Sequence, residues 1–164
     1  LNIILDVTHL SDTSLDQAMD IFAGSVWASH CNCRTLVSGE RQLSDEQIKR
    51  VVERGGVIGA ALDAWMLIPD WQRGVTTPLS SGVKLSHVVD NIDYVCQLAG
   101  NSKHACIGTD LDGGFGLEQS PGDLDSIADL QKLPSLLTAR GYSPEDINNV
   151  MGLNAIDMLR RTWC

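Results

Sequence analysis

The chain has 164 residues, of which 43% are hydrophobic and 20% charged, and its formal net charge is −9. A chain of this length and composition is typical of one globular domain, which buries roughly 70% of its unfolded surface. The acidic balance argues against binding to nucleic acids and to anionic membranes, because both need a basic face.

Four short apolar runs predict four strands. They are residues 3–7, 25–29, 56–61 and 105–108. Their near-continuous apolar character is typical of parallel strands that are covered on both faces.

Helical patterns lie between and after these runs. Apolar residues repeat at helical spacing from Leu15 to Phe22, with Gly24 as a stop. The segment 44–47 predicts a capping box at the start of a helix that Gly55 ends, and a strong apolar stripe covers residues 85–99.

The C-terminal third is also mainly helical in pattern. Residues 123–140 follow a helical pattern interrupted at Pro134, and Ser143 precedes a helix with Pro144 in its first turn. The repeated alternation of strand and helix predicts a parallel α/β architecture. Two closed arrangements fit it: a doubly wound sheet, and a (β/α)8 barrel of which four βα units are half.

Polar residues follow three of the four predicted strands. His9 ends the first run, His30 ends the second, and Asp110 follows the fourth in a Gly-rich segment. In a (β/α)8 barrel the carboxyl ends of the strands form the rim that carries the active site. Two imidazoles and a carboxylate are a typical ligand set for a zinc-like ion. Each residue alone has a structural explanation, but the joint pattern favours a metal-dependent hydrolase.

Cysteine usage and the apolar runs bear on the compartment. The five cysteines are an odd number in a chain too core-rich for a disulfide scaffold, so we expect reduced thiols. No apolar run approaches the ~20 residues of a membrane span, and the start lacks signal-peptide features. Membrane association is therefore not indicated, and the cytoplasm is slightly favoured. Residue 1 is Leu, which fits a fragment, a processed chain or an incomplete gene.

Several longer motifs occur in order. They are LDVTHLSD, ASHCNCR, GERQLSDEQI, GGVIGAAL, ACIGTDLDGGFG and RGYSPEDINNVMGLNAIDMLRR. Together they resemble the membrane dipeptidase family, also called renal dipeptidase or peptidase family M19, over essentially the whole chain. The resemblance is to the C-terminal half of that family. It implies that residues 1–164 form a single domain, the C-terminal half of a TIM barrel, with about the last four βα units and the C-terminal helices.

The resemblance also implies zinc-dependent hydrolysis of dipeptides, with two zinc ions in the intact site. His9 and His30, which are 21 positions apart, match the two histidines on the second zinc. Asp110 matches the carboxylate that takes a proton from the activated water and passes it to the leaving amine. Arg41 matches the arginine that holds the C-terminal carboxylate of the substrate with its guanidinium fork.

The chain departs from the family pattern in several places. The His-x-Asp pair and the bridging Glu of the first zinc site would lie upstream of Leu1, as would a further substrate-binding histidine. Cys31, Gln42 and Asn91 stand where many members have Ser, Asn and His. Because half a barrel leaves open strand edges, we expect either a homo-oligomer or an N-terminal half to complete it.

Several other residues have two interpretations. Cys31 and Cys33 flank His30 and could form a separate zinc site, but we expect them to be spectator thiols. We expect His87 on a helix face and His104 at a strand entry, and neither as a ligand.

The remaining candidates are one aromatic loop and two carboxylates. Trp65, Met66 and Trp71, in the loop after the third strand, could contact substrate, but packing is the preferred interpretation. We expect Asp112 to support the turn that carries Asp110. Asp6 lies within the first strand pattern and needs a partner, for which a histidine is one candidate.

Two other functions stay open. One is a barrel amidohydrolase that acts on another small amide or a lactone, and Arg41 discriminates, because it implies a free carboxylate on the substrate. The other is a non-catalytic half-barrel that serves oligomerisation or binding, which the absent ligands would favour.

Overall fold

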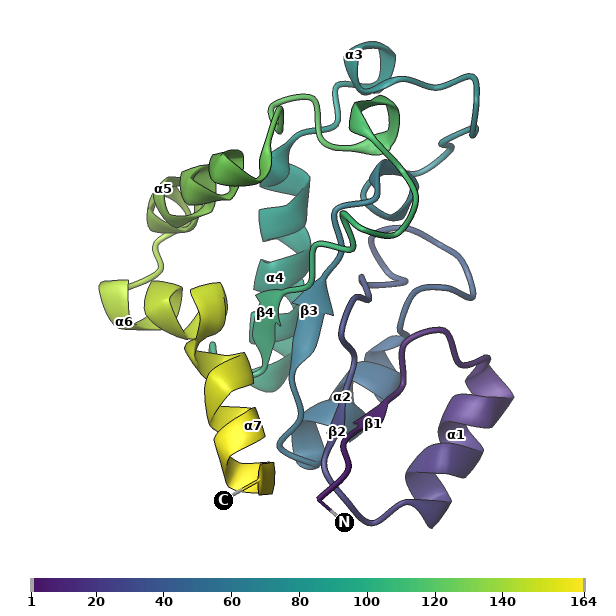
Figure 1. Ribbon diagram of the computed structural model, residues 1–164, viewed down its shortest axis with the longest axis vertical. Coiled ribbons are helices and arrows are strands. Elements are labelled where there is room, and N and C mark those ends of the chain that lie inside the picture. The colour runs from purple at the N-terminus through teal and green to yellow at the C-terminus, as the bar shows by residue number, and fades with distance from the viewer. Residues whose placement is uncertain (1, 164) are drawn as a thin grey trace.

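Two pairs of short parallel strands lie at the centre of the structure, a computed structural model that describes residues 2–163 (Figure 1). β1 (Leu5–Asp6) pairs with β2 (Val26–Trp27), and β3 (Ile58–Ala60) pairs with β4 (Ala105–Ile107). A parallel bridge between Ala28 and Ile58 joins the two pairs. The strands therefore lie side by side in chain order, and all four run in the same direction.

The strands lie within the predicted apolar runs but are shorter than those runs. Hydrogen bonding continues beyond their ends, since the backbone N–H of Cys31 donates to Gly59 O and that of Leu62 donates to Thr109 O. These bonds hold the segments at the carboxyl ends of β2, β3 and β4 against one another.

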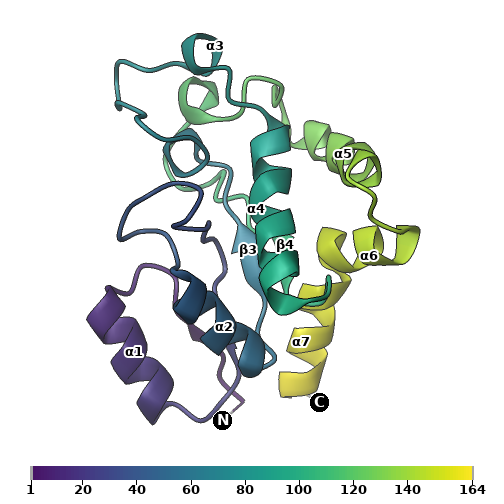
Figure 2. The ribbon, with the colours of Figure 1, turned by 180° about the vertical axis from the view of Figure 1, so that it is seen from behind.

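One longer helix follows each of the first three strands, as the alternation predicts. They are α1 (Asp12–Ile21), α2 (Asp45–Glu53) and α4 (Leu85–Ala99). In Figure 1 the strands face the viewer with α2 and α4 behind them, and Figure 2 shows the same two helices in front of the strands. The core therefore forms between the strands and this helical layer.

The core contains one large cluster of buried apolar side chains. Strands and helices both contribute, and its fully buried members include Val26, Ala28, Ile48, Val51, Val88 and Ile92. The helical spacing of the last four residues explains why α2 and α4 turn these faces inward.

Local signals set the ends of the helices. The predicted capping box is confirmed, because Ser44 Oγ accepts from Gln47 N at 3.3 Å and Gln47 Oε1 accepts from Ser44 N at 2.9 Å. α4 ends at Gly100, whose φ of +68° lies in the left-handed region that glycine adopts most readily.

The segment between β3 and α4 is more ordered than predicted. It holds a 3-10 turn, η1 (Ala64–Met66), and a one-turn helix, α3 (Pro78–Ser81). Thr77 caps α3 and Pro78 occupies its first turn, a signal at Thr77-Pro78 that the apolar pattern did not reveal.

Short helices follow β4. They are η2 (Leu117–Gln119), η3 (Ile127–Lys132), α5 (Leu133–Ala139), α6 (Pro144–Asn148), η4 (Asn149–Leu153), a π-helical turn, and α7 (Asn154–Trp163). The predicted interruption at Pro134 coincides with the junction between η3 and α5, and Pro134 lies in the first turn of α5, where its missing N–H breaks no helical bond. Over residues 2–163, no helix combines the length and apolarity needed to cross a bilayer.

Candidate active site

The candidate metal ligands meet beyond the carboxyl ends of the strands. His9 follows β1, and its Nε2 atom lies 3.0 Å from Nε2 of His30, which follows β2. The two rings meet edge to face, with centroids 5.0 Å apart. Asp110, which follows β4, has Oδ1 3.8 Å from the same nitrogen of His30. The structure thus brings together three residues that are 101 positions apart from first to last in the sequence.

The backbone conformation at two of these residues is unusual. His9 has a φ of +69° and Asp110 a φ of +57°. Non-glycine residues rarely adopt this left-handed conformation, and such residues gather at functional sites where the surroundings hold them. Here it turns each side chain at the point where its strand ends.

Hydrogen bonds from neighbouring residues fix the His30 ring. Ser29 Oγ lies 2.8 Å from His30 Nδ1, and it also donates to Thr8 Oγ1 at 3.3 Å. A His30 ring that binds an ion through Nε2 carries its proton on Nδ1, and the Ser29 hydroxyl is placed to accept that proton. Neither Thr8 nor Ser29 was predicted, although each directly precedes a predicted histidine.

Asp6 supports the site without touching a histidine. Its Oδ1 accepts from the backbone N–H groups of Thr8 and Ser29, at 3.0 and 3.1 Å. Burial alone would raise the pKa of Asp6, but hydrogen bonds from Ser29 and Thr8 outweigh that effect and lower it. The prediction that Asp6 needs a partner is confirmed. A histidine as its direct partner is wrong, because its partners are backbone N–H groups of Thr8 and Ser29, in the two segments that carry the histidines.

Electrostatics favour a neutral imidazole at His30. Burial lowers the pKa of His30; the charge of Asp110 opposes this shift, while the charges of Arg41 and His9 add to it. A neutral imidazole is the form that binds a metal ion.

A backbone carbonyl packs closely behind His30. A Cβ atom added at Gly59 would lie 2.1 Å from Ser29 O, and one added at Gly108 would lie 1.9 Å from the same oxygen. Only glycine at both positions admits the segment that leads into His30.

Arg41 lies beside His30, in the loop between β2 and α2. Its Nη2 donates to His30 O at 3.0 Å, and its Nη1 donates to Cys31 Sγ at 3.1 Å. The guanidinium is partly buried, so the site has one cationic group anchored next to the candidate ligands.

Two buried amides join this loop to the segment after β3. Asn32 Nδ2 donates to Ala61 O and to Met66 O, each at 3.1 Å, while its Oδ1 accepts from Ala61 N at 2.9 Å. Gln42 Nε2 donates to Met66 O at 3.0 Å. The sequence analysis assigned neither residue a role and mentioned Gln42 only as a departure from the family pattern. Their positions in the sequence, close to His30 and Arg41, are the signal that could have found them.

The donor set fits a zinc-like ion in kind but is incomplete. Two imidazole nitrogens face each other and a carboxylate lies nearby, which is the expected chemistry for such an ion. Within residues 2–163, however, no group of three or more His, Cys, Asp or Glu side chains is arranged to hold a metal ion. His9 and His30 are the two groups that would bind one.

The other two histidines lie at the predicted elements, and the two cysteines that flank His30 are buried. His87 Nδ1 accepts from Lys84 N at the start of α4, and His104 Nδ1 lies 2.8 Å from Gly56 O at the entry to β4. Cys31 and Cys33 are buried, and burial raises the pKa of each thiol.

The aromatic loop is mainly packed. Met66 is buried, and Trp65 lies half-buried beneath Arg73, with its Nε1 donating to Asp63 Oδ2 at 2.6 Å. Asp63 itself is buried, and burial raises its pKa. Asp112 is exposed beside the Asp110 turn. These positions favour packing for Trp65 and Met66.

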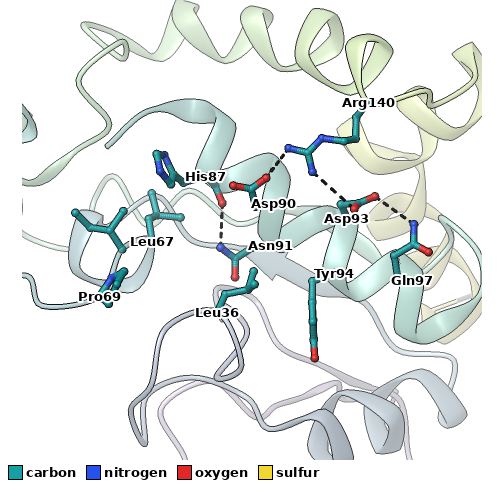
Figure 3. Close-up of a pocket in the computed structure, with 11 residues that line it drawn as sticks. Leu36, Leu67, Pro69, His87, Asp90, Asn91, Asp93, Tyr94, Gln97 and Arg140 are labelled. Atoms are coloured by element: carbon teal, nitrogen blue, oxygen red, sulfur yellow. Dashed lines mark hydrogen bonds and ion pairs between the residues drawn. The ribbon is translucent and has the colours of Figure 1, made fainter. Parts of the chain in front are cut away.

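A separate cavity of about 420 Å³ lies beside α4 (Figure 3). His87, Asn91 and Tyr94 line it together with the loop residues Leu36 and Leu67. The carboxylates of Asp90 and Asp93, from α4, are already paired with the guanidinium of Arg140, which directly follows α5. The cavity contains none of the predicted site residues, so we assign the candidate site by chemistry and not by cavity size.

Comparisons with known proteins identify the family of the chain. The model of the membrane dipeptidase family, peptidase family M19, matches residues 1–162. The chain belongs to this family. An uncharacterised protein of the pqqA 5′ region of Klebsiella pneumoniae is 27% identical over 163 residues, which are 99% of this chain and 56% of that protein. The dipeptidase tcpJ of Claviceps purpurea is 26% identical, over 98% of this chain and 35% of that protein.

A solved structure shows the same fold. The metallo peptidase from Rhodobacter sphaeroides, liganded with a phosphinate mimic of the dipeptide L-Ala-D-Ala, superposes with a TM-score of 0.84 at 23% identity. The match covers 99% of this chain and 43% of that structure. This M19 chain therefore spans between about a third and just over half the length of the relatives it matches.

Proposed function

We propose that the intact protein is a zinc-dependent dipeptidase and that this chain contributes its second metal site and its substrate-carboxylate site. The observation that carries the proposal is the pair of facing imidazoles, with Nε2 atoms 3.0 Å apart, and Asp110 beside them. Membership of the dipeptidase family supports the reaction class.

Each residue has one role in this mechanism. His9 and His30 hold an ion through Nε2, and Ser29 keeps the His30 ring in the required tautomer. When bound, zinc would supply the charge that activates a water molecule and polarises the scissile carbonyl. Asp110 takes a proton from the attacking water and delivers it to the leaving amine.

Arg41 selects the substrate class. A guanidinium binds a carboxylate through two parallel hydrogen bonds, so Arg41 beside the metal ligands fits a substrate with a free C-terminal carboxylate. A dipeptide has this group one residue from its scissile bond. The ligand of the Rhodobacter sphaeroides structure belongs to this class, so we propose dipeptides, including those with a C-terminal D-residue, as substrates.

The remaining metal ligands come from outside this chain. We propose that residues 1–164 are a single domain and the C-terminal half of a (β/α)8 barrel. The first metal site is then completed by a second chain or by an N-terminal half, and the intact site holds two zinc ions.

Metal content tests the ligand assignment. The purified chain is loaded with zinc, desalted and measured by elemental mass spectrometry. We expect at most one weakly held ion, which His9→Ala and His30→Ala each remove and the control His87→Gln leaves in place. Two tightly held ions per chain would contradict the assignment, because this chain offers only half a site.

Hydrolysis by the intact protein tests the function. We expect turnover of dipeptides such as L-Ala-D-Ala and a large loss in Asp110→Asn, roughly 10²-fold or more. Unchanged turnover in Arg41→Ala would favour another amide or lactone as substrate. A zinc-loaded protein that hydrolyses no dipeptide would favour a non-catalytic role.

A further inference from the structure

The guanidinium of Arg41 is held on a thiol, and nothing in the proposed mechanism accounts for that contact. We propose that Cys31 is a positioning residue, whose sulfur orients Arg41 for the substrate carboxylate. The inference rests on the proposed function of Arg41. Its basis is the 3.1 Å hydrogen bond from Arg41 Nη1 to Cys31 Sγ, next to the 3.0 Å bond from Arg41 Nη2 to His30 O.

The thiol is itself fixed in place. Cys31 is 2% exposed, its backbone N–H donates to Gly59 O at 2.8 Å, and its Sγ–H points to Thr8 Oγ1 at 3.7 Å. As a thiol it donates to Thr8 and accepts from Arg41 at the same time.

The donor count leaves Arg41 able to bind substrate. A guanidinium carries five N–H groups, and the sulfur and the carbonyl occupy one on each Nη atom. Three N–H groups remain, enough for a two-bond fork to a carboxylate. A flexible arginine would lose side-chain entropy on forming that fork, whereas an arginine already held at two points loses less.

Cys33, two positions after Cys31, offers a matched control for substitution of Cys31. Cys33 is also buried, but its Sγ lies 3.7 Å from Asn91 O, away from Arg41. Cys31→Ala and Cys33→Ala therefore remove the same atoms from buried sites in one loop, and only the first removes a partner of Arg41. Cys31→Ser restores a small donor and acceptor.

Kinetics on the intact protein test the proposal. Each variant is assayed with a dipeptide and with the same dipeptide carrying a C-terminal amide. We expect Cys31→Ala to raise KM for the free acid roughly three- to tenfold with little change in kcat, and to leave the amide unaffected. Cys31→Ser should recover most of the loss. Equal effects of Cys31→Ala and Cys33→Ala, or equal effects on acid and amide, would overturn the proposal.

A second measurement separates this inference from the proposed function. If Arg41→Ala does not discriminate acid from amide, the assigned role of Arg41 in substrate binding is wrong. The side-chain NMR signals of Arg41 then decide the role of Cys31. Slow guanidinium rotation that persists in Cys31→Ser and is lost in Cys31→Ala supports positioning by the thiol, and rotation unchanged in Cys31→Ala contradicts it.

Discussion

At the residue scale, the candidate site depends on hydrogen bonds that set the protonation and orientation of its histidines. Ser29 and Thr8 lie behind the His30 ring, and Asp6 binds the backbone of both. Because burial lowers the pKa of His30, the ring is neutral at physiological pH and presents a lone pair rather than a charge. Orientation and charge therefore both suit a metal ligand before any metal binds.

A second polar cluster at this scale supports stability, not chemistry. Arg34 binds Asp12 through a fork of 3.0 and 2.7 Å, and Gln47 donates to the same carboxylate at 2.8 Å. Hydrogen bonds from Arg34 and Gln47 lower the pKa of Asp12 to about 2. The cluster joins α1 to α2 and to the loop between β2 and α2.

The pH dependence of stability tests this cluster. The pKa of Asp12 is lower in the folded chain than in the unfolded chain, so its contribution is complete above about pH 4 and is lost as pH falls toward 2. Because the side chain is 46% exposed, we expect Asp12→Asn to cost no more than ~1 kcal/mol at pH 7. Urea unfolding between pH 2.5 and 7 measures the difference. Asp16→Asn, whose carboxylate makes one contact with Arg50, is the control and should show a smaller change.

At the element scale, three of the four strands deliver one polar group to the same end of the sheet. His9, His30 and Asp110 follow β1, β2 and β4, whereas β3 leads into the packed segment of Ala64 and Met66. Within residues 2–163, the side-chain hydrogen bonds and ion pairs of His9, His30, Arg41 and Asp110 go to residues outside the helices. The helices fix where the strands end, through their caps and their apolar faces.

The capping box of α2 gives one prediction at this scale. Ser44→Ala removes the acceptor of Gln47 N and should lower the free energy of unfolding by about 1 kcal/mol. Ser38→Ala, in the exposed loop before α2, is the control and should change it by less than about 0.5 kcal/mol. Denaturant unfolding followed by circular dichroism compares the two. Equal effects would mean that the cap does not stabilise α2.

The glycines that pack against Ser29 give a second prediction at this scale. In Gly59→Ala the new Cβ would lie 2.1 Å from Ser29 O, so backbone must move, and we expect a loss of at least about 2 kcal/mol. Gly122→Ala is the milder control, because its nearest heavy atom would be 3.3 Å away. Thermal unfolding compares them. A Gly59→Ala variant as stable as the control would show that the segment leading to His30 is free to relax.

At the scale of the whole molecule, the sheet ends at β1 on one side. Within the described residues β1 pairs only with β2, and the neighbouring Ile3 is 59% exposed. An edge strand has one row of unpaired backbone groups, and with an apolar neighbour it offers a surface on which another strand can pair. This agrees with the proposal that further barrel strands come from outside the chain.

Association of the isolated chain tests that proposal. We expect sedimentation to show dimers or larger species, and Ile3→Lys to weaken association by adding a charge next to β1. Leu79→Lys is the control, because Leu79 is 94% exposed in α3 and lies away from that edge. A well-folded monomer that stays monomeric at high concentration would contradict the proposal.

The sequence by itself determined the elements and the chemistry at their ends. Apolar runs located all four strands, and Ser44 and Gly55 marked the two ends of α2, because caps and apolar periodicity act over a few residues. His9, His30 and Asp110 stood out as candidates because each follows a predicted strand, and Arg41 became a candidate because it matches an arginine of the family motif. Pro134 marked the junction between η3 and α5, because proline is readily accepted in the first turn of a helix.

Only the tertiary structure decided what these groups touch. The thiol of Cys31 meets Arg41 where the loop after β2 folds back on itself. Asp6 binds the backbone of Ser29 because the parallel register of β1 and β2 sets residues about 20 positions apart face to face. The closeness of Gly59 and Gly108 to Ser29 O depends on three segments at once. Such contacts have no local signature, since each arises from packing between strands whose order the sequence suggests but whose spacing it does not fix.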